Sequence, residues 1–246
     1  MKKITGDVDL SNLYLKEIPE ILNDVVIEDG MFNIDGNSIK NLNNFPISCN
    51  TLHLSRNPIT SLVGIKPKEV WYLEANRTKI KNLDGCPEIV TTLDIKDVIT
   101  FNSLQGTLKK INKNGNFIIQ GCSLSSLDNF PILDSNVLIY LSENKLTSLV
   151  GMPTKCHHLN INSNGLKTLV GCPEHITGNF FCSNNDLQNL DGFPKLIEGD
   201  CLMTVSSLFN DPFMRIHAQF ERELRKRCVI KGEVDLYDDY PKNVQV

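Results

Sequence analysis

The sequence repeats itself with a period close to 21 residues, and this period strongly limits the folds open to the chain. Segments that start at residues 51, 139, 159 and 180 read TLHLSRNPITSLVGIKP, IYLSENKLTSLVGMP, LNINSNGLKTLVGCP and FFCSNNDLQNLDGFP. They share the frame LxLxxNxLxxLxGxP. One leucine position recurs every 20 to 23 residues, at Leu42, Leu62, Leu83, Leu104, Leu127, Leu149, Leu169 and Leu190. The period predicts a stack of similar turns.

The frame begins with the period-2 pattern of a short strand, in which two inward side chains flank one outward side chain. Stacking such strands about 4.8 Å apart builds a parallel sheet. The predicted inward pairs are Val8/Leu10, Phe32/Ile34, Leu52/Leu54, Trp71/Leu73, Leu93/Ile95, Phe117/Ile119, Ile139/Leu141, Leu159/Ile161, Phe180/Cys182 and Cys201/Met203. The sequence therefore predicts one solenoid with about ten strands.

The Asn of the frame follows the second inward residue by three positions, where its amide can bond the backbone of the turn. The predicted ladder comprises Asn37, Asn57, Asn76, Asn144, Asn164 and Asn185, with Cys122 at the same position in one repeat. After it, LxxL adds two core residues and GxP ends regular structure. We expect irregular or 3₁₀ return segments, and the 30 Leu and 27 Asn against two Ala also disfavour helices.

These repeats resemble the short, bacterial type of leucine-rich repeat, and the NxLTSLxGxP flavour looks most like repeat proteins of bacteria and bacteriophages. The resemblance covers about residues 4 to 208. It implies a leucine-rich repeat solenoid, in a family that tolerates Cys at the Asn position. It says little about function, because this fold serves many unrelated partners.

The repeat from Leu93 to Ile111 departs from the frame, since Val98 replaces the Asn and Leu108 replaces the Pro. We expect a bulge, a bend or a projecting loop there. Its lysines suit either a solubilising turn or a secondary contact with a phosphate or an acidic partner; they are Lys109, Lys110 and Lys113.

The frame ends near residue 208, which divides the chain into a solenoid at 1–208 and a C-terminal unit at 209–246. Asn210 or Asp211 can cap a helix that has Pro212 in its first turn. Its apolar stripe would be Phe213, Ile216, Phe220, Leu224 and Cys228, followed by basic residues that suit either the helix dipole or an acidic partner. Val234 and Leu236 predict a last strand, which closes its own sheet or pairs with another chain.

The composition and charge of the chain argue against several classes of function. A net charge of −4 argues against a nucleic-acid binder. No apolar run reaches the roughly 18 residues of a membrane span, and the first residues lack the apolar segment of a signal peptide. We therefore expect a cytoplasmic protein without a membrane partner, in the host cytoplasm if a phage encodes it.

The residues give no support to an enzyme. The sequence has no nucleophile elbow, HExxH, P-loop or dinucleotide fingerprint. Most of the eight Cys occupy core positions of the repeat, and no CxxC pair is present. His157 and His158 are adjacent on a strand and point to opposite faces. We expect no catalytic residue, cofactor or metal.

The outward face of the sheet is the candidate binding surface, because it carries large apolar residues among polar ones. The candidate contacts are His53, Tyr72, Asp94, Ile118, Leu138, Tyr140, His158, Asn160, Phe181 and Leu202. Strand propensity alone could also place such residues there. We expect a non-enzymatic module that binds another protein. The family resemblance implies a bacterial partner, for example a host defence protein that a phage-type protein inhibits or redirects. The alternative is self-assembly through this face and the terminal strands.

Overall fold

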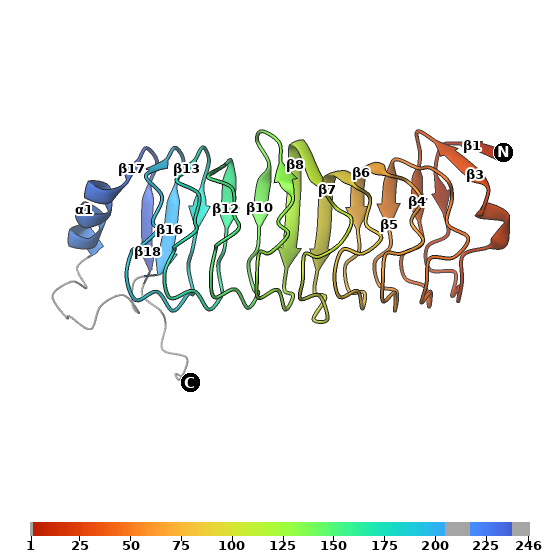
Figure 1. Cartoon of the computed structure of the whole chain (residues 1–246), viewed down its shortest axis with the longest axis horizontal. Helices are drawn as coiled ribbons and strands as arrows, with labels where there is room; N and C mark the ends of the chain where they lie inside the picture. The colour runs from red at the N-terminus through yellow and green to blue at the C-terminus, as the bar shows by residue number, and fades with distance from the viewer. Residues whose placement is uncertain (1, 205–216, 238–246) are drawn as a thin grey trace.

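The computed structural model describes residues 2–204 and 217–237. It is an elongated parallel β-solenoid, with its turns following one another along the long axis (Figure 1). One parallel sheet of twelve strands runs along it. Its strands are β2 (Val8–Asp9), β4 (Met31–Asn33), β5 (Thr51–His53), β6 (Glu69–Glu74), β7 (Ile89–Lys96), β8 (Lys110–Gln120), β9 (Ile132–Leu133), β10 (Leu138–Tyr140), β12 (His158–Asn160), β14 (Phe180–Phe181), β16 (Cys201–Thr204) and β18 (Val234–Tyr237).

The core lies between this sheet and the return segments. The predicted inward pairs from Phe32/Ile34 to Cys201/Met203 are buried, apart from Trp71, and Val8 and Leu10 pack partly buried at the end. Return-side residues close the core from the other side, as where the Phe32 and Phe45 rings lie 5.2 Å apart edge to face. The LxL pattern therefore predicted the buried face of the sheet correctly at nine of ten turns.

Trp71 is the exception, because 64% of its surface is exposed. The strand register pairs Leu52 with Leu73, so the inward pair of this turn is Leu73 and Ala75. The prediction placed the pair two residues too early. Trp71 and Leu73 match the pattern of an inward pair, so the sequence alone favoured the wrong register. In the correct pair, Ala75 is small but fully buried.

The same shift moves the amide position of this turn. Asn76 is not part of the ladder, since its Nδ2 donates to the Glu74 side chain instead. In the correct register, Thr78 occupies the ladder position, three residues after Ala75. Its hydroxyl donates to the Ala75 carbonyl across 2.9 Å. In the preceding turn, Asn57 is part of the ladder, because its side-chain amide donates to a carbonyl of its own turn and to one of the turn before it. Cys122 replaces the Asn as predicted, with its Sγ 3.7 Å from the Ile95 carbonyl oxygen.

A second row of short strands precedes the main sheet in each turn. Near the C-terminal end it is a separate sheet of β11 (Lys155–Cys156), β13 (His175–Ile176), β15 (Leu196–Ile197) and β17 (Val229–Ile230). In the middle of the chain, the first residues of β6, β7 and β8 continue it, ending at β9. Within the described residues, β9 and β11 are not paired with each other, so the row is interrupted between them. At the N-terminal end, β1 (Lys2–Thr5) pairs with β3 (Val25–Glu28).

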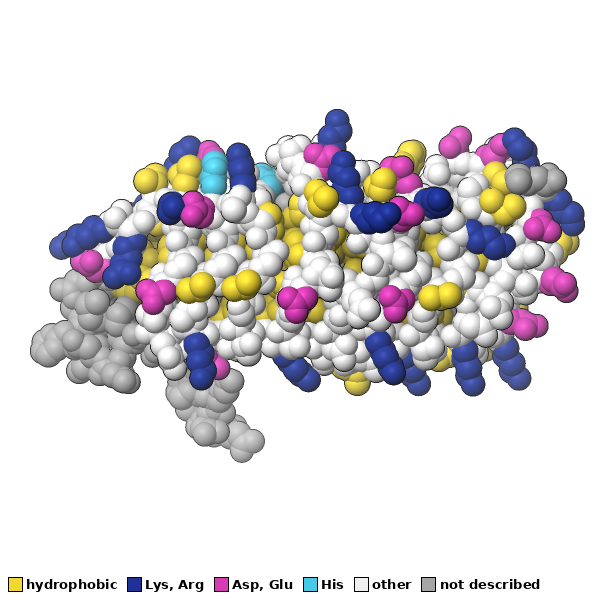
Figure 2. Space-filling model, viewed as in Figure 1, with side chains coloured by type: hydrophobic (Ala, Val, Ile, Leu, Met, Phe, Trp, Pro, Cys, Tyr) yellow, Lys and Arg dark blue, Asp and Glu magenta, His cyan; other side chains and the backbone are white. Residues whose placement is uncertain are grey.

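The return side is irregular, as predicted. Within the described ranges, η1 (Glu20–Leu22) is the one 3₁₀ helix, and the other return segments are turns and bends. In the space-filling view, Lys and Arg side chains project mainly from the upper and lower margins of the solenoid (Figure 2).

The degenerate repeat forms the predicted bulge. Val90 pairs with Ile111 and Thr92 pairs with Asn116, so the segment 112–115 lies opposite one residue of β7. Lys109 and Lys110 form surface ion pairs with Glu88 and Asp134, at 2.5 Å and 3.1 Å. Lys113 is exposed. The lysines of this repeat therefore lie on the surface beside the bulge.

Helix α1 (His217–Arg227) covers the C-terminal end of the solenoid (Figure 1). Phe220, Leu224 and Cys228 of the predicted stripe are buried. The rest of the predicted helix start, Asn210, Asp211, Pro212, Phe213 and Ile216, lies outside the described residues. Strand β18 pairs with β16 of its own chain, which answers the question that the sequence left open about Val234 and Leu236.

Two basic residues of α1, Arg225 and Lys226, are engaged with their own helix and the segment that follows it. Arg225 bonds Glu221 at 2.8 Å and the Ile230 carbonyl at 2.7 Å, and Lys226 pairs with Glu223. The charges of these two residues are therefore compensated within the C-terminal cap.

Candidate functional site

The outward residues between the inward pairs form one continuous row along the main sheet. Successive strand registers align Asp9, Asn33, His53, Glu74, Asp94, Ile118, Tyr140, Asn160, Phe181, Leu202 and Asp235. The row changes character midway. From Asp9 to Asp94 it is polar and mostly acidic, whereas from Ile118 to Leu202 it is mainly apolar. The face is therefore divided along its length.

Tyr72 was predicted for this central row, and that placement is wrong. Glu74 occupies the central position, and Tyr72 lies in the flanking row opposite Thr51 and Thr92. The Tyr72 ring still lies on the same face, 5.3 Å from the His53 ring. Burial, followed by the charges of Glu74 and Asp94, raises its pKa.

The C-terminal half of the face holds an aromatic stack across three turns. The His158 ring lies 5.3 Å from Tyr140 and 5.0 Å from Phe181, the latter edge to face. We use the name apolar patch for six partly exposed apolar or aromatic residues of this half: Ile118, Leu138, Tyr140, His158, Phe181 and Leu202. Asn160, also predicted as a contact, lies within it as a partly exposed polar residue.

His158 behaves as an aromatic residue within this patch. Burial and the neighbouring His157 charge lower the pKa of its imidazole. Its Nε2 is inaccessible and has no hydrogen-bond partner among the described residues. Protonation would place an uncompensated charge among aromatic rings, so the neutral ring is favoured.

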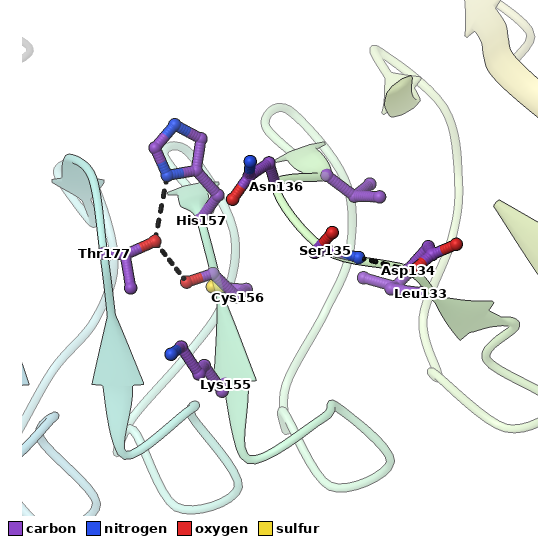
Figure 3. Close-up of a pocket in the computed structure, with 9 residues that line it drawn as sticks. Leu133, Asp134, Ser135, Asn136, Lys155, Cys156, His157 and Thr177 are labelled. Carbon is purple, nitrogen blue, oxygen red and sulfur yellow. Dashed lines mark hydrogen bonds between the residues drawn. The ribbon is translucent and has the colours of Figure 1, made fainter. Parts of the chain in front are cut away.

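His157 was predicted to lie on the same strand as His158, but it lies between β11 and β12. Its Nδ1 lies 2.9 Å from the Thr177 hydroxyl. It lines a cavity of about 510 Å³ at the interruption between β9 and β11 (Figure 3). Asp134, Asn136 and Lys155 are other polar residues of this cavity. The cavity is open and mixed in polarity.

The N-terminal half of the face holds a hydrogen-bonded group of polar residues. Glu74 is its centre and accepts hydrogen bonds from Ser55, at 3.0 Å, and Asn76, at 2.9 Å. The Tyr72 hydroxyl lies 3.4 Å from Glu74 and 3.5 Å from Asp94. Asp94 is buried and pairs with Lys96 at 2.9 Å. Asp94 is thus less accessible than its predicted role as a contact requires.

All eight cysteines are free, and seven of them are buried. Burial raises the pKa of Cys49, Cys156 and Cys201 to about 12. A thiol with such a pKa is not ionised near neutral pH and is a poor nucleophile or metal ligand. The cysteines therefore serve as core residues, in agreement with their repeat positions.

Comparisons with protein-family models, with curated proteins and with solved structures find no significant match. No helix in the described part of the chain has the length and apolar character needed to cross a membrane.

Sequence reasoning missed the grouping of His53 with Asp35 and Glu74, whose ligand atoms lie within 4.8 Å of one another. Neither Glu74 nor Asp35 is among the contacts predicted from the sequence. The signal that could have found them is the 21-residue spacing from Leu52 to Leu73, which sets Glu74 beside His53.

Proposed function

We propose that this chain is a leucine-rich-repeat-like, non-enzymatic module that binds another protein through the apolar patch. The observation that carries the proposal is the aromatic stack of Tyr140, His158 and Phe181 on three consecutive strands. Aromatic residues on a solvent-facing sheet are favoured at the centre of protein interfaces, where they bury a large area at little cost in conformational entropy.

The surroundings of the patch support a partner with an apolar, uncharged surface. Ile118, Leu138 and Leu202 extend the stack, and the residues beside it are uncharged polar groups such as Gln120, Asn160 and Asn162. An apolar centre with a polar rim is the usual anatomy of a protein interface. In the central row, carboxylates border the patch only at its two ends, with Asp94 beside Ile118 and Asp235 beside Leu202.

The solenoid supports binding by its rigidity. Each strand of the patch is bonded to its neighbours in register, and the side chains below it are fully buried. A preorganised surface loses little conformational entropy when it docks. As the resemblance implies, we further propose a bacterial target, with a phage-type inhibitor or modulator of a host protein as the biological setting.

The test compares two double variants. Tyr140→Ala/Phe181→Ala removes the ends of the aromatic stack, and Val150→Ala/Val170→Ala removes two exposed valines of the return side as a matched control. Bait proteins capture partners from bacterial lysate, and a captured protein is then purified and titrated calorimetrically. We expect the patch variant to bind at least 30-fold more weakly and the control to bind like the wild type.

Two outcomes would contradict the proposal. Equal affinity of both double variants for the purified partner would place the contact elsewhere. A wild-type chain that captures nothing but sediments as an oligomer, and becomes monomeric with Tyr140→Asp, would establish the patch as a self-assembly surface instead. Circular dichroism of each variant confirms that it retains the fold.

A further inference from the structure

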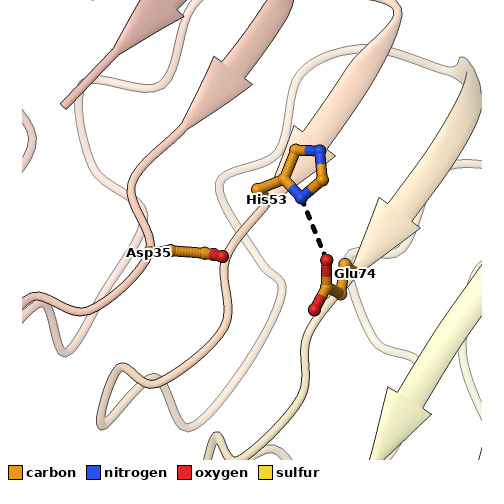
Figure 4. A group of neighbouring side chains, drawn as sticks. All are labelled: Asp35, His53 and Glu74. Carbon is orange, nitrogen blue, oxygen red and sulfur yellow. Dashed lines mark hydrogen bonds and ion pairs between the residues drawn. The ribbon is translucent and has the colours of Figure 1, made fainter. Parts of the chain in front are cut away.

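Three side chains of metal-ligating type meet on the polar half of the face, away from the apolar patch. Asp35, His53 and Glu74 come from three successive turns, and one ligand atom of each lies within 4.8 Å of the other two (Figure 4). His53 Nδ1 and Glu74 Oε2 are 3.0 Å apart. Two ligands bonded to one ion at about 2.0 to 2.2 Å lie roughly 3 to 3.5 Å from each other, so this pair already has a suitable separation.

The strand register fixes the backbone positions that carry these three side chains. His53 lies directly opposite Glu74, and Asp35 follows strand β4 on the other side of His53. Ser55 positions both carboxylates, because its backbone N–H donates to Asp35 at 2.6 Å and its hydroxyl donates to Glu74 at 3.0 Å. Asn76 also donates to Glu74. Such outer hydrogen bonds orient the carboxylate ligands of metal sites.

A second observation is a buried carboxylate oxygen without a hydrogen-bond donor in the next strand. Asp94, opposite Glu74 in register, is 94% buried, and its Oδ1 has no hydrogen-bond partner among the described residues. Its other oxygen bonds Lys96. A buried carboxylate oxygen without a donor is costly, and a cation held by the neighbouring group would stabilise it in addition to Lys96.

Asp35 is partly buried, and its Oδ1 accepts a hydrogen bond from the Ser55 backbone N–H. Arg56, Arg77 and Lys96 border the cluster, but Arg77 pairs with Asp97 at 3.1 Å and Lys96 pairs with Asp94. Among the described residues, Asp35 and Glu74 therefore have no ion pair with a Lys or Arg side chain.

We propose that Asp35, His53 and Glu74 bind one divalent transition-metal ion of the zinc class. An imidazole nitrogen with two carboxylate oxygens suits Zn²⁺, Co²⁺ or Mn²⁺, whereas Ca²⁺ and Mg²⁺ prefer oxygen ligands throughout. Water completes the coordination, since the three side chains are partly exposed. The ion offsets the carboxylate repulsion and joins three turns of the solenoid. This site is separate from the proposed binding function and does not depend on it.

The experiment titrates the full chain with Zn²⁺ by calorimetry at neutral pH and with Co²⁺ by visible absorption. The variants His53→Gln and Asp35→Asn each remove one ligand but keep a polar side chain. His175→Gln is the matched control, because His175 pairs with Glu198 at 2.6 Å on the second sheet without belonging to such a group. We expect one ion per chain, about 100-fold weaker binding in both ligand variants and unchanged binding in the control.

Thermal unfolding supplies a second readout for variants with altered basal stability. Zn²⁺ should raise the melting temperature of the wild type and of His175→Gln, and leave that of Asp35→Asn unchanged. Absence of binding by the wild type would overturn the proposal. So would equal affinity in His53→Gln or Asp35→Asn, which would assign the ion to another site and leave His53 and Glu74 as a simple surface pair.

Discussion

The side-chain amide of Asn57 donates to the main-chain carbonyl of Ile34, which lies one full turn earlier, across 2.8 Å. The same amide donates to Leu54 and Ser55, and its oxygen accepts from the backbone N–H of Ile39. One buried side chain thus satisfies backbone groups of two turns that no strand pairing reaches.

Replacing Asn57 with Ala should lower the free energy of unfolding by about 3 kcal/mol, because several buried backbone groups lose their partner. Asn102→Ala, at an exposed position, should change it by less than about 0.5 kcal/mol. Urea denaturation followed by circular dichroism gives both values. Similar losses in the two variants would show that the amide ladder contributes little.

Gly85→Ala should be more damaging than Gly6→Ala, although both glycines have positive φ. A Cβ at Gly85 would lie 2.2 Å from the Val63 backbone nitrogen, whereas a Cβ at Gly6 would meet no atom within 4 Å. We expect a loss of more than about 3 kcal/mol at Gly85, and about 1 to 2 kcal/mol from backbone strain alone at Gly6. Equal denaturation midpoints would refute the role of close turn stacking.

His158 should make the fold sensitive to mild acid. Its folded-state pKa is lowered by burial, so below the unfolded value of about 6.5 the unfolded chain binds a proton that the folded chain does not. The free energy of unfolding therefore falls as the pH decreases from about 6.5 through the folded-state pKa. His158→Phe keeps a ring between Tyr140 and Phe181 and should lose this part of the dependence. Denaturation at several pH values from 7.5 to about 5 measures the difference.

Trp71, the one tryptophan, should report the strand register directly. With 64% of its surface exposed, its fluorescence should be quenched by iodide in the folded protein nearly as strongly as in urea. A tryptophan in the core, as the alternative register requires, would be protected from iodide. Strong protection in the folded state would therefore return Trp71 to the inward row.

The repeat predicted most of the core because large apolar residues at period 2 have few other places to go in a narrow solenoid. The prediction of the core was wrong between residues 71 and 76, where two residue patterns matched the repeat frame in the wrong register. Trp71 and Leu73 imitate an inward pair, and Asn76 imitates the ladder Asn. The correct residues, Ala75 and Thr78, are too small and too unspecific to be recognised without the neighbouring strand.

The candidate site was predictable only in part for the same reason. The apolar patch follows from single positions of the frame, so Tyr140 and Phe181 were identified from the sequence. The Asp35, His53 and Glu74 cluster depends on a diagonal relation between turns, and a two-residue shift at Glu74 removes it from view. The second row of strands and its interruption also escaped, because strands of two residues carry no periodicity.

The bulge opposite β7 has a practical consequence. Pairing resumes at Thr92 and Asn116 after segment 112–115, and the later turns keep their alignment. Extra chain length is thus absorbed at one corner without being passed to the next turn. The exposed pair Lys113 and Asn114 is therefore the natural position for inserting an epitope or a fluorescent label.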